Sequence, residues 1–204
     1  MDDRTEYFNL IDRSKWPELT GPWEHEPDFV EWIDSETSMV CRIMRNRFGV
    51  WCGYVGVAKA HPLHAVEYGQ SAPCLIPLRD AMMNKPMPEN PGMALMMAAI
   101  LGGPIEPTAD VVFRVHGGIT FAGKHGKRFL FKSTPDAHKD LWWFGFDCGH
   151  AGDFTPCHAL SFGEEQQYRT MDYAMTEVAT LARQIHEVGT TWESNKHTIG
   201  VCLN

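Results

Sequence analysis

Apolar and polar positions alternate over two neighbouring stretches in the first third of the chain. Residues 38–45 and 48–57 each follow the two-residue period of a strand, and the Arg-Asn-Arg sequence between them suits a short hairpin turn. A short helix is predicted before them over residues 27–33, because proline is favoured at the first helical position. The pattern therefore predicts a helix followed by a β-hairpin.

A second group of strands is predicted after residue 110. Residues 110–120, 127–132 and 141–148 have the pattern of a three-stranded antiparallel meander with turn residues between the strands. The first and third strands of a meander run in the same direction. His116, near the end of the first, and Asp147, at the end of the third, should therefore lie at one edge of the sheet.

A long amphipathic helix is predicted close to the C-terminus. A capping-box pattern at residues 161–164 indicates its start, and Gly189 is a natural stop. Between them, apolar side chains recur at spacings of three and four, which is typical of a helix covering a sheet. These side chains are Met171, Met175, Val178, Leu181, Ile185 and Val188.

The segment over about residues 70–110 is rich in proline and methionine and interrupts the strand pattern. Within it, residues 90–101 predict a helix that is apolar on nearly all sides and should be buried. It is either a packed insertion or a methionine-rich surface that binds a host protein or a second copy of the chain. The whole pattern predicts one α+β domain over residues 1–204. This domain has an antiparallel sheet of about five strands, a long C-terminal helix on one face and this insertion.

Charge and cysteine usage exclude several classes of protein. A net charge of -8 argues against non-specific nucleic-acid binding, which depends on neutralising phosphates. The acidic N-terminus lacks the features of a secretion signal, and no apolar run is long enough to cross a bilayer. The six scattered cysteines include no CxxC motif. We therefore expect a cytoplasmic protein with free thiols and no membrane partner.

Candidate chemistry is concentrated in residues 141–153, where an aromatic run passes directly into metal-binding and proton-transferring residue types. The shorter stretch over residues 111–118 has the same form and ends on a histidine and two glycines. The predicted catalytic residues are His116, Asp147, Cys148, His150 and Asp153. The predicted ligand-binding residues are Arg114, Gly117, Gly118, Trp143, Gly149 and Gly152, since glycines let backbone amides approach a ligand.

Three functions are compatible with this set. The first is a zinc centre with His116, Cys148 and His150 as ligands, since zinc binds Cys and His. The second is metal-free chemistry in which Cys148 attacks or the histidines transfer protons, oriented by Asp147 or Asp153. The third is binding without turnover, with an aromatic wall stacking on a base. Packing explains each residue singly, but not four such residues within one short, glycine-flanked segment.

The stretches VHGGITF (115–121) and WWFGFDCGHAGD (142–153) resemble a group of uncharacterised proteins from bacteriophages and bacteria. The likeness covers about half the chain and leaves residues 70–110 outside it. It implies a phage or bacterial cytoplasmic setting, which is the host cytoplasm for a phage-encoded protein. It carries no activity over to this chain.

Taken together, these observations predict a small hydrolase acting on a nucleotide-like small molecule, which would be a host immune signal in a phage setting. The alternative is a non-catalytic protein that sequesters a nucleotide or blocks a host protein.

Overall fold

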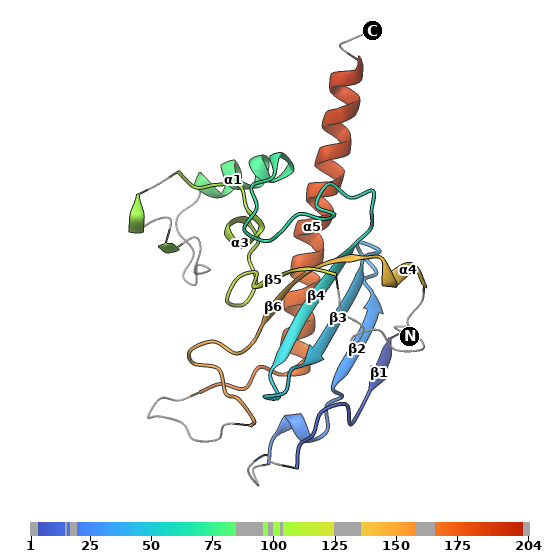
Figure 1. Cartoon of the computed structure of the whole chain (residues 1–204), viewed down its shortest axis with the longest axis vertical. Helices are drawn as coiled ribbons and strands as arrows, with labels where there is room; N and C mark the ends of the chain where they lie inside the picture. Colours follow the sequence, from blue (N-terminus) through green and yellow to red (C-terminus); the bar gives the residue numbers. More distant parts are fainter. Residues whose placement is uncertain are drawn as a thin grey trace.

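A six-stranded antiparallel sheet with the strand order β1-β2-β3-β4-β6-β5 forms the centre of the molecule (Figure 1). The computed structural model describes residues 4–14, 16, 20–84, 96–97, 100–102, 104–124, 136–157 and 166–201. The strands are β1 (Thr5–Tyr7), β2 (Phe29–Ile33), β3 (Val40–Arg45), β4 (Trp51–Val57), β5 (Phe121–Gly123) and β6 (Trp142–Asp147). The helices are η1 (Pro22–Glu24), η2 (Pro73–Leu75), α1 (Ile76–Met83), α3 (Ala109–Val112), α4 (Asp136–Lys139) and α5 (Met171–Val201). The protein is therefore α+β, as its sequence predicts.

The predicted hairpin is confirmed as β3 and β4, which pair from Val40 opposite Gly56 to Arg45 opposite Trp51. The turn closes with the Asn46 N–H donating to the carbonyl of Val50 at 3.0 Å. The pattern identified this hairpin because one face of each strand is buried throughout.

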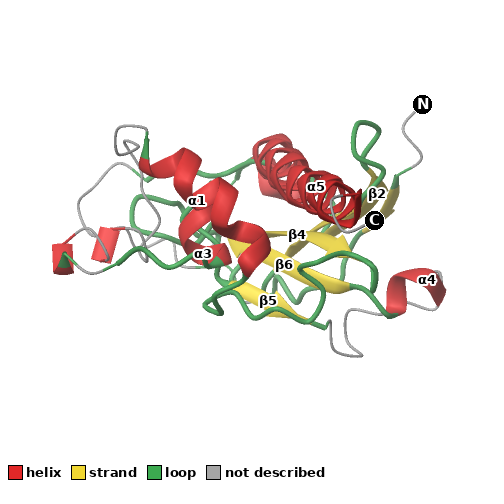
Figure 2. Ribbon diagram, turned by 90° about the horizontal axis from the view of Figure 1, so that it is seen from above, coloured by secondary structure: helices red, strands yellow, loops and turns green. Residues whose placement is uncertain are grey.

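The predicted C-terminal helix is α5, which lies along one face of the sheet (Figure 2). Its close approach to β4 depends on Gly53, where an added Cβ would lie 2.5 Å from a methyl group of Val178. Side chains alternate along a strand, so Val55 faces α5 with Gly53, whereas Tyr54 faces away. The predicted stripe is confirmed, with four of its residues almost fully buried: Val178, Leu181, Ile185 and Val188.

Both predicted ends of this helix need revision. The capping box at residues 161–164 lies outside the described residues, and α5 begins at Met171, whose N–H donates to the Glu26 carboxylate at 2.8 Å. A carboxylate there is favourable, because a helix N-terminus is positively polarised. Gly189 is not a stop. The helix continues through Gly189, whose lack of a side chain leaves room for His61, since an added Cβ would lie 2.9 Å from Nε2 of His61. This nitrogen is hydrogen-bonded to the Ile185 carbonyl at 3.1 Å.

Two other predictions are wrong. Residues 29–33 form β2 rather than a helix, because pairing with β3 satisfies their backbone while Phe29 and Val30 are buried. Residues 110–120 form the end of α3 and a loop rather than a strand, since this segment packs beside α5 instead of joining the sheet. The middle strand of the predicted meander, residues 127–132, lies outside the described residues.

The described residues of the predicted apolar helix over 90–101 are exposed, contrary to the expectation of burial. They are Met96, Met97, Ile100 and Leu101. None of the described helices combines the length and the apolar character needed to cross a bilayer.

Candidate functional site

Polar side chains of α5 hold the loop that follows α3. The Gln184 amide bonds both backbone groups of Arg114, accepting from its N–H at 2.8 Å and donating to its carbonyl at 2.9 Å. Two turns earlier in the helix, the Glu177 carboxylate accepts from the His116 N–H at 2.7 Å. These contacts bring His116 to the edge of the sheet where β6 ends.

His116 lies between a carboxylate and a phenol. Its Nε2 is 2.6 Å from Oδ2 of Asp153, and its Nδ1 is 2.9 Å from the hydroxyl oxygen of Tyr173 in α5. A carboxylate accepts only, so we infer that Nε2 carries the proton. In the neutral imidazole, Nδ1 then accepts from the Tyr173 hydroxyl. The three groups form a continuous hydrogen-bonded relay, which is hereafter the Asp153–His116–Tyr173 relay.

Asp153 is the buried end of this relay. Its side chain is 1% exposed and also accepts from Nε of Arg169 at 2.7 Å and from the His150 N–H at 3.0 Å. Burial opposes ionisation of Asp153, but the hydrogen bonds from His116, Arg169 and His150 outweigh it and lower the pKa of this carboxyl. Asp153 is therefore a carboxylate at neutral pH.

Tyr173 and Arg169 form the more accessible side of the cluster. Burial and then the charge of Glu177 raise the pKa of the Tyr173 hydroxyl, which keeps its proton at neutral pH. The Arg169 guanidinium lies 5.0 Å from the centre of the Tyr173 ring, and 24% of its side chain is exposed. A cation next to a proton donor is a suitable arrangement for binding an anionic group.

His150 packs beside the relay without joining it through a ring hydrogen bond. The rings of His116 and His150 are 5.4 Å apart, and Nε2 of His150 is buried without a partner among the described residues. An added Cβ at Gly117 would lie 1.8 Å from this nitrogen, and Gly117 has a φ of 67°. Glycine is therefore required at this position for both space and backbone conformation.

Cys148 is a packing residue rather than a nucleophile. It is 1% exposed, and its N–H donates to the Trp51 carbonyl at 2.8 Å. Burial, followed by the negative charges of Asp153 and other neighbours, raises the pKa of this thiol well above its usual range. A thiol that stays protonated is a poor nucleophile.

The predicted zinc ligands do not fit a metal centre. Within the described part of the chain, no three His, Cys, Asp or Glu side chains are placed to hold a metal ion. Both ring nitrogens of His116 are already engaged by Asp153 and Tyr173. His116 therefore belongs to the hydrogen-bonded relay with Asp153 and Tyr173 rather than to a zinc site with Cys148 and His150.

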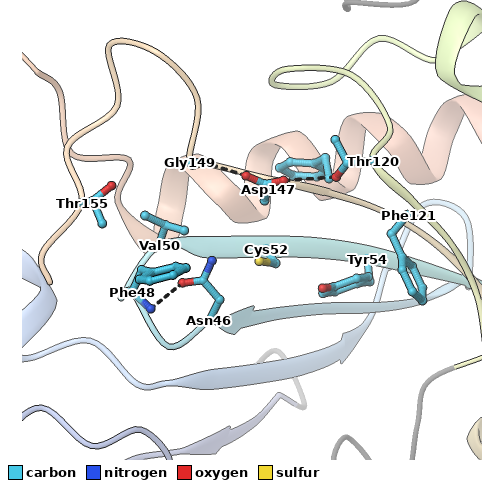
Figure 3. Close-up of a pocket in the computed structure, with 11 residues that line it drawn as sticks. Asn46, Phe48, Val50, Cys52, Tyr54, Thr120, Phe121, Asp147, Gly149 and Thr155 are labelled. Atoms are coloured by element: carbon cyan, nitrogen blue, oxygen red, sulfur yellow. Dashed lines mark hydrogen bonds between the residues drawn. The ribbon is translucent and has the colours of Figure 1, made fainter. Parts of the chain in front are cut away.

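Asp147 faces a separate pocket of about 370 Å³ on the side of the sheet away from α5 (Figure 3). Its carboxylate accepts from the Gly149 N–H at 3.0 Å and from the Thr120 hydroxyl at 3.2 Å. Aromatic side chains from the β3–β4 hairpin and from β5 form part of the wall. They are Phe48, Tyr54 and Phe121.

The segment over residues 147–153 thus divides between two places. Asp147 and Gly149 line the pocket, whereas His150 and Asp153 lie with His116 beside α5. The sequence predicted that His116 meets the 147–153 segment through two strand ends. His116 does contact Asp153, but from a loop rather than from a strand end. Asp147, however, lies apart from this contact, because alternation along β6 places its side chain on the opposite face.

The predicted ligand-binding residues have varied positions. Trp143 is a core residue that is 1% exposed. The guanidinium carbon of Arg42 lies 4.2 Å from the centre of the Trp143 ring. Arg114 is held through its backbone. Gly118 and Gly152 have φ angles of 86° and 88°, which glycine adopts readily in tight turns.

Sequence reasoning missed Tyr173, Glu177 and Arg169. Tyr173 and Glu177 are four residues apart and therefore share one face of α5. This spacing was the available signal, but polar residues beside an apolar helical stripe usually face solvent.

Comparison with protein-family models, with curated protein sequences and with solved structures found no match for this chain.

Proposed function

We propose that this protein is a small hydrolase that uses the Asp153–His116–Tyr173 relay to act on a nucleotide-like, anionic small molecule. The observation that supports this proposal is the position of His116, with Asp153 at 2.6 Å on one ring nitrogen and Tyr173 at 2.9 Å on the other. An ionised carboxylate behind an imidazole stabilises the imidazolium that forms when the ring takes a proton.

In the proposed reaction, a water oxygen attacks a phosphorus atom of the nucleotide, and the bond from this phosphorus to the leaving-group oxygen breaks. The Tyr173 hydroxyl takes the proton of the water while passing its own proton to Nδ1 of His116. The proton then returns by the same route to the leaving group. Arg169 binds the anionic oxygens, because its guanidinium is partly exposed beside Tyr173.

A second candidate function is sequestration of a nucleotide without turnover. The pocket at Asp147 favours it, because aromatic walls and one carboxylate are sufficient to hold a base. The resemblance to bacteriophage proteins adds a setting to both proposals, a host cytoplasm in which the ligand is an immune signal.

A panel of cyclic and linear nucleotides, followed by chromatography, tests the proposal. We expect turnover of at least one nucleotide by the wild-type protein and its loss in His116→Ala. His186→Ala changes an exposed histidine of α5 and should keep full turnover. A nucleotide that is retained and then released intact on denaturation would support sequestration and overturn the hydrolase.

A further inference from the structure

The pocket at Asp147 has the chemistry of a site for a neutral ring rather than for a phosphate. Asp147 is the charged side chain among the described residues that line it, and these include neither lysine nor arginine. A phosphate group placed against Asp147 would therefore meet a carboxylate. Arg47, whose guanidinium carbon lies 4.6 Å from the centre of the Phe48 ring, is not among the lining residues. The pocket is therefore distinct in charge from the Arg169 side of the relay.

The Asp147 carboxylate offers two acceptors side by side. Oδ1 accepts one hydrogen bond from the Gly149 N–H and Oδ2 accepts one from the Thr120 hydroxyl. A carboxylate oxygen can accept two hydrogen bonds, so each oxygen retains capacity for a ligand. The same two contacts hold the carboxylate in one orientation, as Figure 3 shows. Two parallel acceptors in a fixed orientation match a ligand edge that carries two adjacent N–H donors.

The walls of the pocket suit a flat ring. The rings of Tyr54 and Phe121 meet edge to face with centres 5.7 Å apart, and Phe48 lies on the hairpin turn at the other side of Cys52 (Figure 3). Tyr54 can lie over β6 because Gly145 has no side chain, since a Cβ there would be 2.3 Å from the Tyr54 ring. A volume of about 370 Å³ is sufficient for one bicyclic ring system.

We propose that this pocket binds a 2-amino-4-oxopyrimidine edge, the donor pair shared by guanine and the pterins, with Asp147 accepting from the ring N–H and the exocyclic amine. Adenine and cytosine each place a ring acceptor beside their amine, so one Asp147 oxygen would face a lone pair. Hypoxanthine lacks the exocyclic amine and supplies one donor of the two. Recognition of such edges by paired hydrogen bonds gives discrimination of about ten- to a hundredfold.

This site stands apart from the relay, and its test measures binding without turnover. Calorimetric titration of the wild-type protein with guanosine, inosine, adenosine and pterin separates the two sources of the same edge. We expect guanosine or pterin, or both, to bind at least tenfold more tightly than inosine and adenosine. The proposal would be overturned if neither guanosine nor pterin bound more tightly than adenosine.

Variants assign the edge to Asp147. Asp147→Asn should remove the preference for guanosine over adenosine, whereas Asp140→Asn, at an exposed carboxylate paired with Lys59, should leave it unchanged. Should Asp147→Asn fail to fold, Phe121→Leu serves instead and should weaken all ring ligands about tenfold through lost stacking. An unchanged preference for guanosine in folded Asp147→Asn would contradict the assignment to Asp147, and an unchanged guanosine affinity in Phe121→Leu would contradict binding in this pocket. His116→Ala should retain guanosine binding, so failure of the hydrolase proposal and failure of this one give different results.

Discussion

Nε2 of His116 lies 2.6 Å from Oδ2 of Asp153, a residue 37 positions further along the chain. This contact joins the loop after α3 to the turn after β6 and orients the imidazole. It also places a buried negative charge behind the histidine, with Arg169 as its second partner.

Replacing Asp153 by asparagine should destabilise the protein by about 3 kcal/mol at neutral pH, because His116 and Arg169 would lose their shared carboxylate. The pKa of Asp153 is lowered in the folded state, so its contribution to stability is complete above the ordinary carboxyl pKa of about 4. This contribution is lost as the pH falls through the lowered pKa that Asp153 has in the folded protein. Urea unfolding of both proteins between pH 7 and pH 2 should therefore show a difference that shrinks only below about pH 4.

Asp172→Asn is the control for this experiment, because Asp172 is exposed in the first turn of α5. It should change stability by less than about 0.5 kcal/mol. A difference between wild type and Asp153→Asn that stays constant down to pH 2 would contradict the assignment of an ionised Asp153.

Gly117→Ala should destabilise the protein more than a left-handed conformation alone explains. The φ of 67° costs an alanine about 1–2 kcal/mol, and the added methyl group would also displace the His150 ring. Gly102→Ala is a matched control, with a φ of 64° and nothing within 4 Å of an added Cβ. Thermal unfolding should show an extra loss of about 2 kcal/mol for Gly117→Ala. Equal losses in the two variants would mean that His150 does not occupy this space.

Gln184→Ala should loosen the loop that carries His116. It removes two hydrogen bonds to the backbone of Arg114, worth about 1–2 kcal/mol of stability together. Amide hydrogen exchange at Arg114 and His116 should become faster, while the neighbouring exposed Arg183→Ala leaves it unchanged. Unaltered exchange in Gln184→Ala would show that other contacts hold the loop.

Cys148 should resist alkylation in the folded protein, because burial raises the pKa of its thiol and leaves it 1% exposed. Mass spectrometry after iodoacetamide treatment should find Cys157, which is partly exposed, modified ahead of Cys148. Cys148→Ala should also retain turnover. Rapid labelling of Cys148, or loss of turnover in this variant, would restore the thiol as a nucleophile.

The sequence predicted those elements whose apolar residues recur with a regular period. Apolar residues recur at a period of two along β3 and of three to four along α5, and each period is typical of its element. β2 was missed because Phe29 to Ile33 is short and shows no alternation of apolar and polar residues, and Pro27 suggested a helix. The apolar residues 111–113 suggested a strand, but contacts with α5, which local sequence does not encode, place this segment beside the helix.

The candidate site was predicted only in part, because local sequence indicates which residue types are present but not which segments dock together. The composition of residues 147–153 indicated a site, and His116 does meet Asp153. The split between Asp147 and Asp153 depends on where β6 ends, and Tyr173 enters only through the docking of α5. Neither fact is a property of a single segment.

Turnover by Tyr173→Phe tests the central claim most directly, because this change removes one oxygen and the proton that the relay transfers. With the nucleotide substrate identified from the panel, we predict that kcat falls by about 100-fold or more while KM changes little. Tyr68→Phe, at an exposed tyrosine outside the cluster, should have wild-type kinetics. A Tyr173→Phe protein that hydrolyses the nucleotide at the wild-type rate would contradict the Asp153–His116–Tyr173 relay as the catalytic machinery.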